Sequence, residues 1–259
     1  MTLERFDVAR SGPEAGAQSP WWGVHASRYL FAAPMVRGRR VLDIACGTGY
    51  GLEILAGEAR AVVGVDADWE AVRAAVRGGR GPRAIVLGDG ARLPFPPATF
   101  DAITSFETLE HLEQRDGFLA ELARVLRPDG VCILSTPNAN YTQPVDGQPR
   151  NPFHVHEYTP QELRDALGRR FTSVEMLGQE MDRRFAISPF WDDQQRLPRR
   201  TSVQARLLAW KVFNRLPRAI GDALARVLLG QPLVPTEHDY RFSAATVAGA
   251  PVLVAICRT

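Results

Sequence analysis

The fold is decided by the stretch Val41-Leu-Asp43-Ile-Ala-Cys-Gly47-Thr-Gly49-Tyr-Gly51, in which an apolar segment of strand length leads directly into three closely spaced glycines. Glycines let a ligand approach the backbone, and the start of the helix expected to follow offers unpaired N–H groups. The spacing is G-x-G-x-G, and the acidic Asp43 stands just before it, where its charge would repel a pyrophosphate. The stretch therefore favours a cofactor with a cationic end over a dinucleotide.

Apolar segments of strand length alternate with helix-length periodic segments from residue 40 onward. This alternation predicts an α/β fold, with a mostly parallel sheet covered by helices. The expected strands are residues 41–44, 61–65, 84–86, 102–106, 131–135, 171–176 and 252–256. We expect a single domain that carries an N-terminal cap segment, residues 1–38, and a helical insertion or lid, residues 183–238, between the sixth and seventh strands.

The insertion contains two amphipathic segments with basic polar faces, residues 204–215 and 219–229. Such helices can form a lid over a substrate or contact an anionic membrane surface peripherally. They can equally pack on the edge of the sheet or in a dimer contact. The sequence leaves these alternatives open and does not indicate an oligomeric state.

The composition narrows the choice of partner and compartment. The 31 Lys and Arg residues nearly balance the 29 Asp and Glu residues, so the net charge of +2 argues against a dedicated nucleic-acid binder. Cys46, Cys132 and Cys257 are far apart, which argues against a disulfide framework and favours the reducing cytoplasm. The sequence has no apolar segment of about 18 residues and no signal-peptide core at its start, so we expect a soluble protein.

Acidic residues follow the second and third expected strands. Asp66 ends the second strand, where a carboxylate can accept hydrogen bonds from both ribose hydroxyls of an adenosine. Asp89 follows the third strand, where a carboxylate can accept from an adenine amino group. Both residues and the glycine-rich turn lie at the carboxyl ends of successive strands, which is the edge where open α/β sheets bind ligands.

Four ordered motifs resemble those of class I S-adenosylmethionine-dependent methyltransferases. They are the D-x-x-x-G-x-G turn, the acid after the second strand, Gly88-Asp89, and the segment Phe100-Asp-Ala-Ile-Thr-Ser-Phe-Glu107. The resemblance covers about residues 20–180 and the last strand. It implies a Rossmann-like sheet of seven strands, of which the last is antiparallel, and S-adenosyl-L-methionine as the cofactor.

The resemblance also assigns cofactor contacts. It implies that the methionine part of the cofactor approaches the backbone at Gly47 and Gly49. It also implies that Asp66 binds the ribose and that Asp89 binds the adenine. Arg28, in the expected helix His25-Ala-Ser-Arg28-Tyr29, would pair with the methionine carboxylate; alternatively, Arg28 is a surface charge and Tyr29 a core residue. The full expected set of cofactor-binding residues is Arg28, Asp43, Gly47, Gly49, Asp66, Asp89 and Phe106.

Acidic residues and histidines follow the fourth and fifth strands. Glu107, Glu110 and His111 would converge if a helix starts near Thr108, and a later loop carries His154 and His156. Histidine titrates near neutrality and serves as a general base or a metal ligand. Methyl transfer needs an acceptor that is deprotonated and held in line with the methyl group. His111, His154 and Glu110 are therefore the candidate catalytic residues.

The E-x-x-E-H segment with the downstream H-x-H resembles the metal site of small-RNA 3′-terminal 2′-O-methyltransferases and is also similar to a pattern in ubiquinone-pathway O-methyltransferases. The resemblance implies metal-assisted O-methylation, in which Mg²⁺ or Mn²⁺ chelates vicinal oxygens and lowers the pKa of a hydroxyl. The implied ligands are Glu107, Glu110, His111 and one of His154 and His156. Without a metal, His111 or His154 is the candidate general base.

The acceptor is indicated by resemblance alone. The helix with Arg28, the glycine-rich turn and the Asn151-Pro-Phe-His154 loop look like those of bacterial methyltransferases of glycan and natural-product biosynthesis. This resemblance implies a hydroxyl of a saccharide or of a glycosylated small molecule as acceptor. The alternatives are a phenol or quinone O-methyltransferase with a lipid-like substrate, an RNA 3′-end 2′-O-methyltransferase, and a non-catalytic cofactor-binding module.

Overall fold

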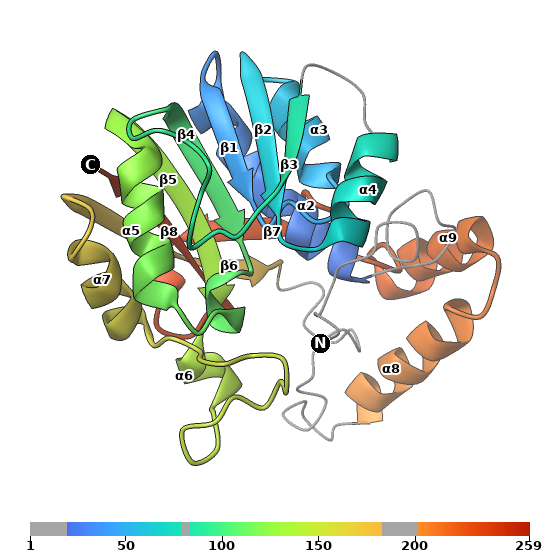
Figure 1. Cartoon of the computed structure of the whole chain (residues 1–259). Helices are drawn as coiled ribbons and strands as arrows, with labels where there is room; N and C mark the ends of the chain where they lie inside the picture. Colours follow the sequence, from blue (N-terminus) through green and yellow to red (C-terminus); the bar gives the residue numbers. More distant parts are fainter. Residues whose placement is uncertain (1–19, 79–82, 183–200) are drawn as a thin grey trace. The chain divides into compact units, whose positions relative to one another are not determined.

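The structure is a computed structural model that describes residues 20–78, 83–182 and 201–259 (Figure 1). The described residues form two compact units. One contains residues 28–78, 83–180 and 242–259, and the other contains residues 20–27, 181–182 and 201–241. The first part of the expected cap segment and the start of the expected insertion lie outside the described residues.

Eight strands form one sheet in the order β3-β2-β1-β4-β5-β8-β6-β7 (Figure 1). The pairs β1–β2, β1–β4, β2–β3 and β4–β5 are parallel. The last strand, β8, runs antiparallel to both β5 and β6, as expected. The strands are β1 (Arg40–Ile44), β2 (Ala61–Asp66), β3 (Arg83–Leu87), β4 (Phe100–Phe106), β5 (Leu126–Pro137), β6 (Ser173–Met181), β7 (Tyr240–Ser243) and β8 (Val252–Arg258).

The expectation of seven strands is wrong by one. The additional strand is β7, which has only four residues, includes the charged Arg241 and lies at the edge of the sheet beside β6. Its residues Tyr240-Arg-Phe-Ser243 alternate between apolar and polar, but four residues are the shortest segment in which alternation can indicate a strand. The expected strand at residues 171–176 also lies further along the chain, because β6 begins at Ser173 and continues to Met181.

Helices cover both faces of the sheet. Leu119 and Leu122 of α5 and Leu163 of α7 belong to one buried core cluster, whereas Tyr29 of α2 and Leu52 of α3 belong to another. The helices are α2 (Pro20–Ala32), η2 (Ala33–Val36), α3 (Tyr50–Ala56), α4 (Trp69–Gly78), η3 (Leu109–His111), α5 (Arg115–Val125), α6 (Ala139–Thr142), α7 (Pro160–Gly168), α8 (Thr201–Phe213), α9 (Arg218–Leu229) and η5 (Ala244–Thr246). Cys46, Cys132 and Cys257 are buried and form no disulfide.

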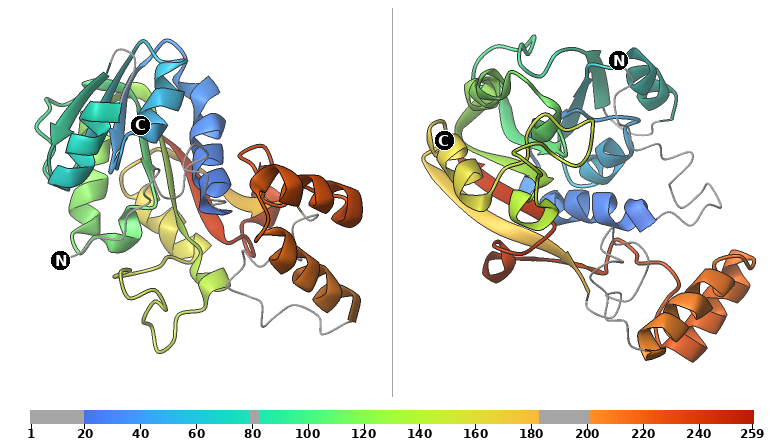
Figure 2. Two further views of the ribbon diagram at one scale, coloured as in Figure 1. Left: turned by 90° about the vertical axis from the view of Figure 1, so that its right-hand side faces the viewer. Right: turned by 90° about the horizontal axis from the view of Figure 1, so that it is seen from below.

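The two helices expected in the insertion are present as α8 and α9, between β6 and β7 (Figure 2). They have a small core of their own, in which Trp210, Phe213, Ala225 and Leu233 are buried. The indole Nε1 of Trp210 donates a hydrogen bond of 2.6 Å to the carbonyl oxygen of Leu233. Their role as a lid stays a prediction.

The outward sides of α8 and α9 are unusually apolar. Exposed fractions range from 50% to 80% for Leu208, Val212, Ile220, Val227 and Leu228. Residues 201–229 contain five cations and one acid, Asp222. None of the described helices is long and apolar enough to span a bilayer. Peripheral contact of residues 204–229 with a membrane therefore stays a prediction.

We expect the protein to sediment with vesicles that contain an anionic phospholipid, because exposed apolar side chains and nearby cations both favour the lipid interface. The double substitution Leu208→Ser/Val212→Ser should reduce the sedimented fraction severalfold. Val76→Ser, at an apolar side chain of α4 that is 63% exposed, is the matched control and should change nothing. Equal sedimentation of all three proteins would contradict the expected membrane contact.

Gly51 serves packing between α2 and α3. A Cβ atom at Gly51 would lie 2.1 Å from Cζ of Tyr29, so only glycine fits there. The ring of Tyr29 makes edge-on contacts with Tyr50, at a centroid distance of 5.3 Å, and with Phe106, at 4.8 Å. The third glycine of the G-x-G-x-G turn thus lets an aromatic side chain, and not a ligand, approach the backbone.

Gly51→Ala should lower the free energy of unfolding by about 1–3 kcal/mol, because the added methyl group forces the buried Tyr29 ring out of its position. Denaturation in urea measures this change. Gly117→Ala is the control, since a Cβ atom there would meet no atom within 4 Å, and it should leave the stability unchanged or raise it slightly. Equal effects of the two substitutions would refute the packing role.

Candidate active site

The turn after β1 provides open space for a ligand. Gly47 and Gly49 adopt positive φ angles of 55° and 86°. A Cβ atom at Gly47 would meet no atom within 4 Å. The hydroxyl of Thr48, between the two glycines, is buried and has no hydrogen-bond partner in the described part of the chain. An accessible backbone beside an unsatisfied hydroxyl fits the binding of a polar ligand.

The two acidic residues lie where the sequence predicts them, at the ends of β2 and β3. Asp66 Oδ2 accepts a hydrogen bond of 2.8 Å from the Gly47 amide, and its Oδ1 accepts one of 2.9 Å from the Asp68 amide. Each carboxylate oxygen has two lone pairs, so Asp66 can still accept from a ligand. Asp89 is exposed, and its Oδ1 accepts from the Ala91 amide at 2.8 Å. Their contacts with ribose and adenine stay predictions.

Asp43 lies beneath the turn and is fully buried. Its Oδ1 accepts a hydrogen bond of 2.6 Å from the Thr104 hydroxyl, and its Oδ2 accepts one of 3.2 Å from Tyr29. Burial raises the pKa of Asp43 to about 7, although hydrogen bonds from Thr104 and Tyr29 act in the opposite direction. Through these hydrogen bonds, Asp43 of β1 is connected to β4 and to α2. Its expected contact with the cofactor stays a prediction.

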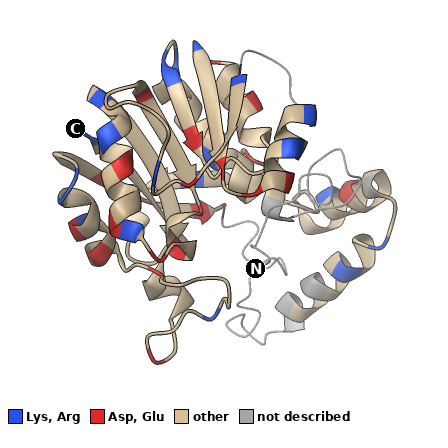
Figure 3. Cartoon of the chain, viewed as in Figure 1, with Lys and Arg blue, Asp and Glu red and all other residues tan. Residues whose placement is uncertain are grey.

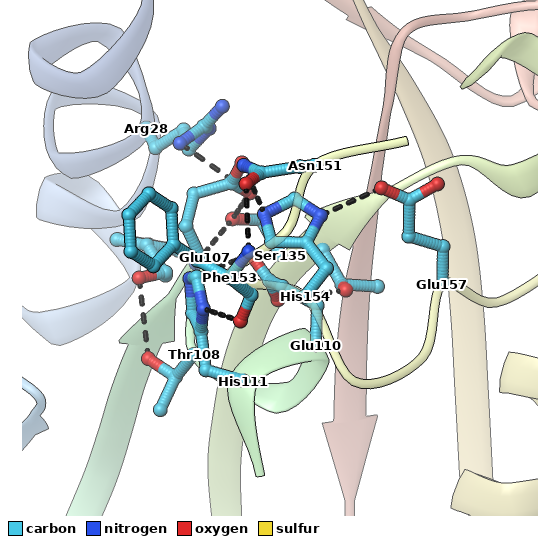
Figure 4. Close-up of polar contacts among 12 residues, drawn as sticks. Arg28, Glu107, Thr108, Glu110, His111, Ser135, Asn151, Phe153, His154 and Glu157 are labelled. Atoms are coloured by element: carbon cyan, nitrogen blue, oxygen red, sulfur yellow. Dashed lines mark hydrogen bonds and ion pairs between the residues drawn. The ribbon is translucent and has the colours of Figure 1, made fainter. Parts of the chain in front are cut away.

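Arg28 is not a surface charge, because only 1% of it is exposed. Its Nε donates to Gln179 Oε1 at 2.7 Å, and its Nη1 lies 3.5 Å from Glu107 Oε1 (Figure 4). Glu107 Oε1 also accepts from the Ser135 hydroxyl at 2.8 Å.

Phe106, the remaining residue expected to contact the cofactor, is 8% exposed and packs in the core. The roles of Arg28 and Phe106 toward the cofactor stay predictions.

Glu110 has a buried oxygen without a partner. The expected helix near Thr108 is only the short turn η3, and α5 begins later, at Arg115. Glu110 is fully buried in η3; its Oε2 accepts from the Thr136 hydroxyl at 2.9 Å, and its Oε1 has no hydrogen-bond partner among residues 20–78, 83–182 and 201–259. Burial first, and the charge of Glu107 second, raise the pKa of Glu110 well above its usual range.

His111 and His154 lie beside Glu110 (Figure 4). His111 Nδ1 lies 3.0 Å from the Phe153 carbonyl oxygen, which can only accept, so Nδ1 carries the proton. His111 Nε2 then has the lone pair and lies 3.9 Å from Glu110 Oε1. The two imidazole rings meet edge to face at a centroid distance of 4.8 Å.

Backbone hydrogen bonds join the two loops that carry these side chains. The amides of Val155 and His156 donate to the Glu110 carbonyl oxygen at 2.7 and 3.2 Å. His154 Nδ1 lies 2.6 Å from Glu157 Oε1, and its Nε2 lies 3.0 Å from Asn151 Nδ2. The loop after β5 is therefore fixed both to the turn after β4 and within itself.

Three of the five candidate metal ligands come together. Glu110, His111 and His154 each offer a ligand atom, and these atoms lie within 4.8 Å of one another. Glu107 is outside this group and contacts Arg28 and Ser135 instead. The structure also distinguishes the two later histidines, because His156 packs edge to face on Tyr158 at 4.5 Å. Burial, followed by the charge of Arg115, lowers the pKa of His156.

Sequence reasoning missed Glu157, which is 5% exposed and contacts His154. It also accepts a hydrogen bond from the hydroxyl of Thr142. Burial raises the pKa of Glu157, but hydrogen bonds from His154 and Thr142 outweigh burial and hold the pKa below its usual range. The sequence could have indicated this contact through the segment His154-Val-His-Glu157, in which a carboxylate follows a candidate ligand by three residues.

Part of the chain is similar to known methyltransferases. Residues 42–134 match a family model described as a methyltransferase domain. A probable S-adenosylmethionine-dependent methyltransferase of Mycolicibacterium smegmatis is 40% identical over 159 residues, which cover 61% of each chain. A demethylmenaquinone methyltransferase of Corynebacterium urealyticum is 36% identical over 137 residues, or 52% of this chain and 56% of the relative. The chain thus spans about three fifths of the length of these curated relatives.

A solved structure agrees at the level of the fold. The crystal structure of an S-adenosylmethionine-dependent methyltransferase from Archaeoglobus fulgidus matches with a TM-score of 0.58 and 18% identity, over 91% of this chain and 93% of that one. Residues 42–134 include the glycine-rich turn, both strand-end acids and η3. The part of the chain that carries these features is therefore similar to a methyltransferase domain, and the printed names of the relatives give the same class and cofactor that the sequence predicts.

Asp66→Ala should weaken the affinity for S-adenosylhomocysteine at least severalfold, because it removes both the expected ribose acceptor and the bond that holds the Gly47 amide. Isothermal titration calorimetry measures this affinity. Asp116→Ala removes an acid whose side chain is 78% exposed and serves as the control. An unchanged affinity in Asp66→Ala would overturn the placement of the ribose.

Proposed function

We propose that the protein is an S-adenosylmethionine-dependent O-methyltransferase that acts, with the help of a divalent metal, on a hydroxyl of a saccharide or a glycosylated small molecule. One observation carries the metal assignment: Glu110 Oε1 is buried without a partner beside two imidazoles. A buried carboxyl oxygen that no described residue of the protein satisfies fits a cation as its partner.

The residues present fit such a cation. Two imidazole nitrogens and one carboxylate oxygen suit Mn²⁺, Fe²⁺ or Co²⁺ at least as well as Mg²⁺. Each of the three side chains is oriented by its own partner: Glu110 by Thr136, His111 by a backbone carbonyl, and His154 by Glu157. Partners of this kind orient ligands in known metal sites and are as important as the ligands themselves.

The chain's own residues have distinct tasks in the proposed reaction. The turn at Gly47 and Gly49, supported by Asp66, would hold the cofactor at the carboxyl end of β1. Glu110, His111 and His154 would hold the cation, which supplies a Lewis acid that lowers the pKa of a neighbouring hydroxyl. The methyl group passes from the sulfonium to the hydroxyl oxygen, and S-adenosylhomocysteine and one proton are released. In a mechanism without a metal, a histidine Nε2 lone pair accepts that proton.

A second candidate is O-methylation of a phenol or quinol with a lipid-like tail. Phe153 and Val155, on either side of His154, are 49% and 43% exposed, so the loop at the site presents apolar side chains. The similarity to a demethylmenaquinone methyltransferase supports a quinone skeleton for the acceptor of this candidate; it does not bear on which atom is methylated. An RNA acceptor is disfavoured, because the net charge is only +2 and charges of both signs are interspersed in the view of Figure 3.

The metal proposal is tested by titrating Mn²⁺ and Mg²⁺ into EDTA-treated protein saturated with S-adenosylhomocysteine. We expect stoichiometric binding that is lost in Glu110→Ala/His111→Ala and retained in His156→Ala, because His156 lies outside the cluster. His111→Ala alone should retain the cofactor and lower turnover by at least about 10²-fold.

Absence of binding to the wild-type protein would reject chelation and leave a histidine base. The acceptor class is separated by methyl transfer from labelled S-adenosylmethionine to saccharides and to quinols. Transfer to quinols alone would select the second candidate, whereas transfer to saccharides supports the first.

A further inference from the structure

His154 is held at both ring nitrogens. Its Nδ1 lies 2.6 Å from Glu157 Oε1, and its Nε2 lies 3.0 Å from Asn151 Nδ2. The amide of Asn151 has a defined orientation, because its Oδ1 accepts a hydrogen bond of 3.0 Å from the Phe153 amide. The amide nitrogen of Asn151 can only donate, so Nε2 of His154 must accept. These contacts place the proton of His154 on Nδ1 and the lone pair on Nε2.

Each contact is anchored elsewhere in the structure. Glu157 is buried, and it also accepts a hydrogen bond from the hydroxyl of Thr142 at the end of α6. Asn151 is fixed by the backbone that follows it. The imidazole is therefore held between a buried anion on one side and an amide donor on the other. Glu157 does not belong to the group of acidic and histidine side chains that offer ligand atoms to a cation.

We infer that Glu157 and Asn151 are positioning residues that act on His154 in opposite ways. Glu157 fixes the proton on Nδ1 and so makes Nε2 the nitrogen that binds a ligand. Asn151 occupies the lone pair of Nε2 until a ligand takes its place. This inference rests on the proposed function, because the ligand in question is the divalent cation held by Glu110, His111 and His154.

The opposite actions follow from the bonds that form and break when a ligand binds at Nε2. The bond to Glu157 remains and is strengthened, because the carboxylate compensates the positive charge that the imidazole gains. A carboxylate in this position typically accounts for 10–100-fold in metal affinity. The bond from Asn151 is broken instead, and the loss of one neutral hydrogen bond corresponds to about fivefold in affinity. Removal of Glu157 should thus weaken the site, and removal of Asn151 should not.

The test combines two measurements on the full chain saturated with S-adenosylhomocysteine. Long-range ¹H–¹⁵N spectra report which imidazole nitrogen of His154 carries the proton, and titration with Mn²⁺ reports the affinity. For the wild type we expect the proton on Nδ1. Glu157→Gln should weaken Mn²⁺ binding at least about tenfold. Asn151→Ala should keep the proton on Nδ1 and bind Mn²⁺ as tightly as the wild type or up to about tenfold more tightly.

Two controls separate these effects from a loss of folding. Glu175→Gln makes the same chemical change at an exposed acid of β6 and should leave both readouts unchanged. Thr142→Val removes the hydrogen bond to Glu157 together with one to the Asn138 carbonyl oxygen, keeps the Glu157 carboxylate, and should weaken Mn²⁺ binding less than Glu157→Gln does. The wild-type spectrum requires no substitution at all, so it tests the inference even if Glu157→Gln does not fold.

Three results would overturn the inference: a proton on Nε2 of His154 in the wild type, unchanged Mn²⁺ affinity in Glu157→Gln, or a loss of affinity in Asn151→Ala as large as that in Glu157→Gln. Failure of the proposed function has a different signature. If the wild type binds no Mn²⁺, the proposed metal site is wrong. The inference that Asn151 occupies the Nε2 lone pair until a cation replaces it is then rejected as well. The spectra then decide separately whether Glu157 fixes the proton.

Discussion

The candidate site depends on two backbone hydrogen bonds, from the amides of Val155 and His156 to the carbonyl oxygen of Glu110. Parallel pairing of β4 with β5 brings the ends of these strands to one edge of the sheet, but it does not determine where the following loops go. The two bonds join these loops directly. Together with the contact of His111 Nδ1 with the Phe153 carbonyl oxygen, they fix the separation of His111 and His154 and so bring the ligand atoms into one group.

The buried positive charge of Arg28, in α2, is balanced by the carboxylate of Glu107. Arg28 lies between Gln179 and Glu107 and is almost completely removed from water. A buried charge is costly unless it is paired and hydrogen-bonded, so each of these groups requires the others. The pairing also explains why Glu107 is not among the clustered ligand atoms: its Oε1 is engaged by Arg28 and Ser135.

Local patterns in the sequence predict the sheet and the cofactor turn well, because strand periodicity, glycine spacing and strand-end acids act over short distances. The convergence of His111 and His154 was predictable for the same reason. The edge strand β7 is so short that its alternation gives only a weak signal, and the partner of Arg28, Gln179, is 151 residues away in the chain. The contact of Glu157 with His154 depends on how a loop folds back on itself, which composition does not reveal.

The buried oxygen of Glu110 lowers the stability of the fold, whereas the proposed metal site requires it. Leaving a buried polar atom unsatisfied costs about 1–3 kcal/mol of folding free energy. Burial also raises the pKa of Glu110 in the folded protein, so folding stability declines as the pH rises through that value. Apolar residues of similar shape in place of both Glu110 and its hydrogen-bond partner Thr136 would make a more robust protein without a site. Selection for thermal robustness alone would therefore remove Glu110, and engineered stabilisation of this scaffold must leave that position unchanged.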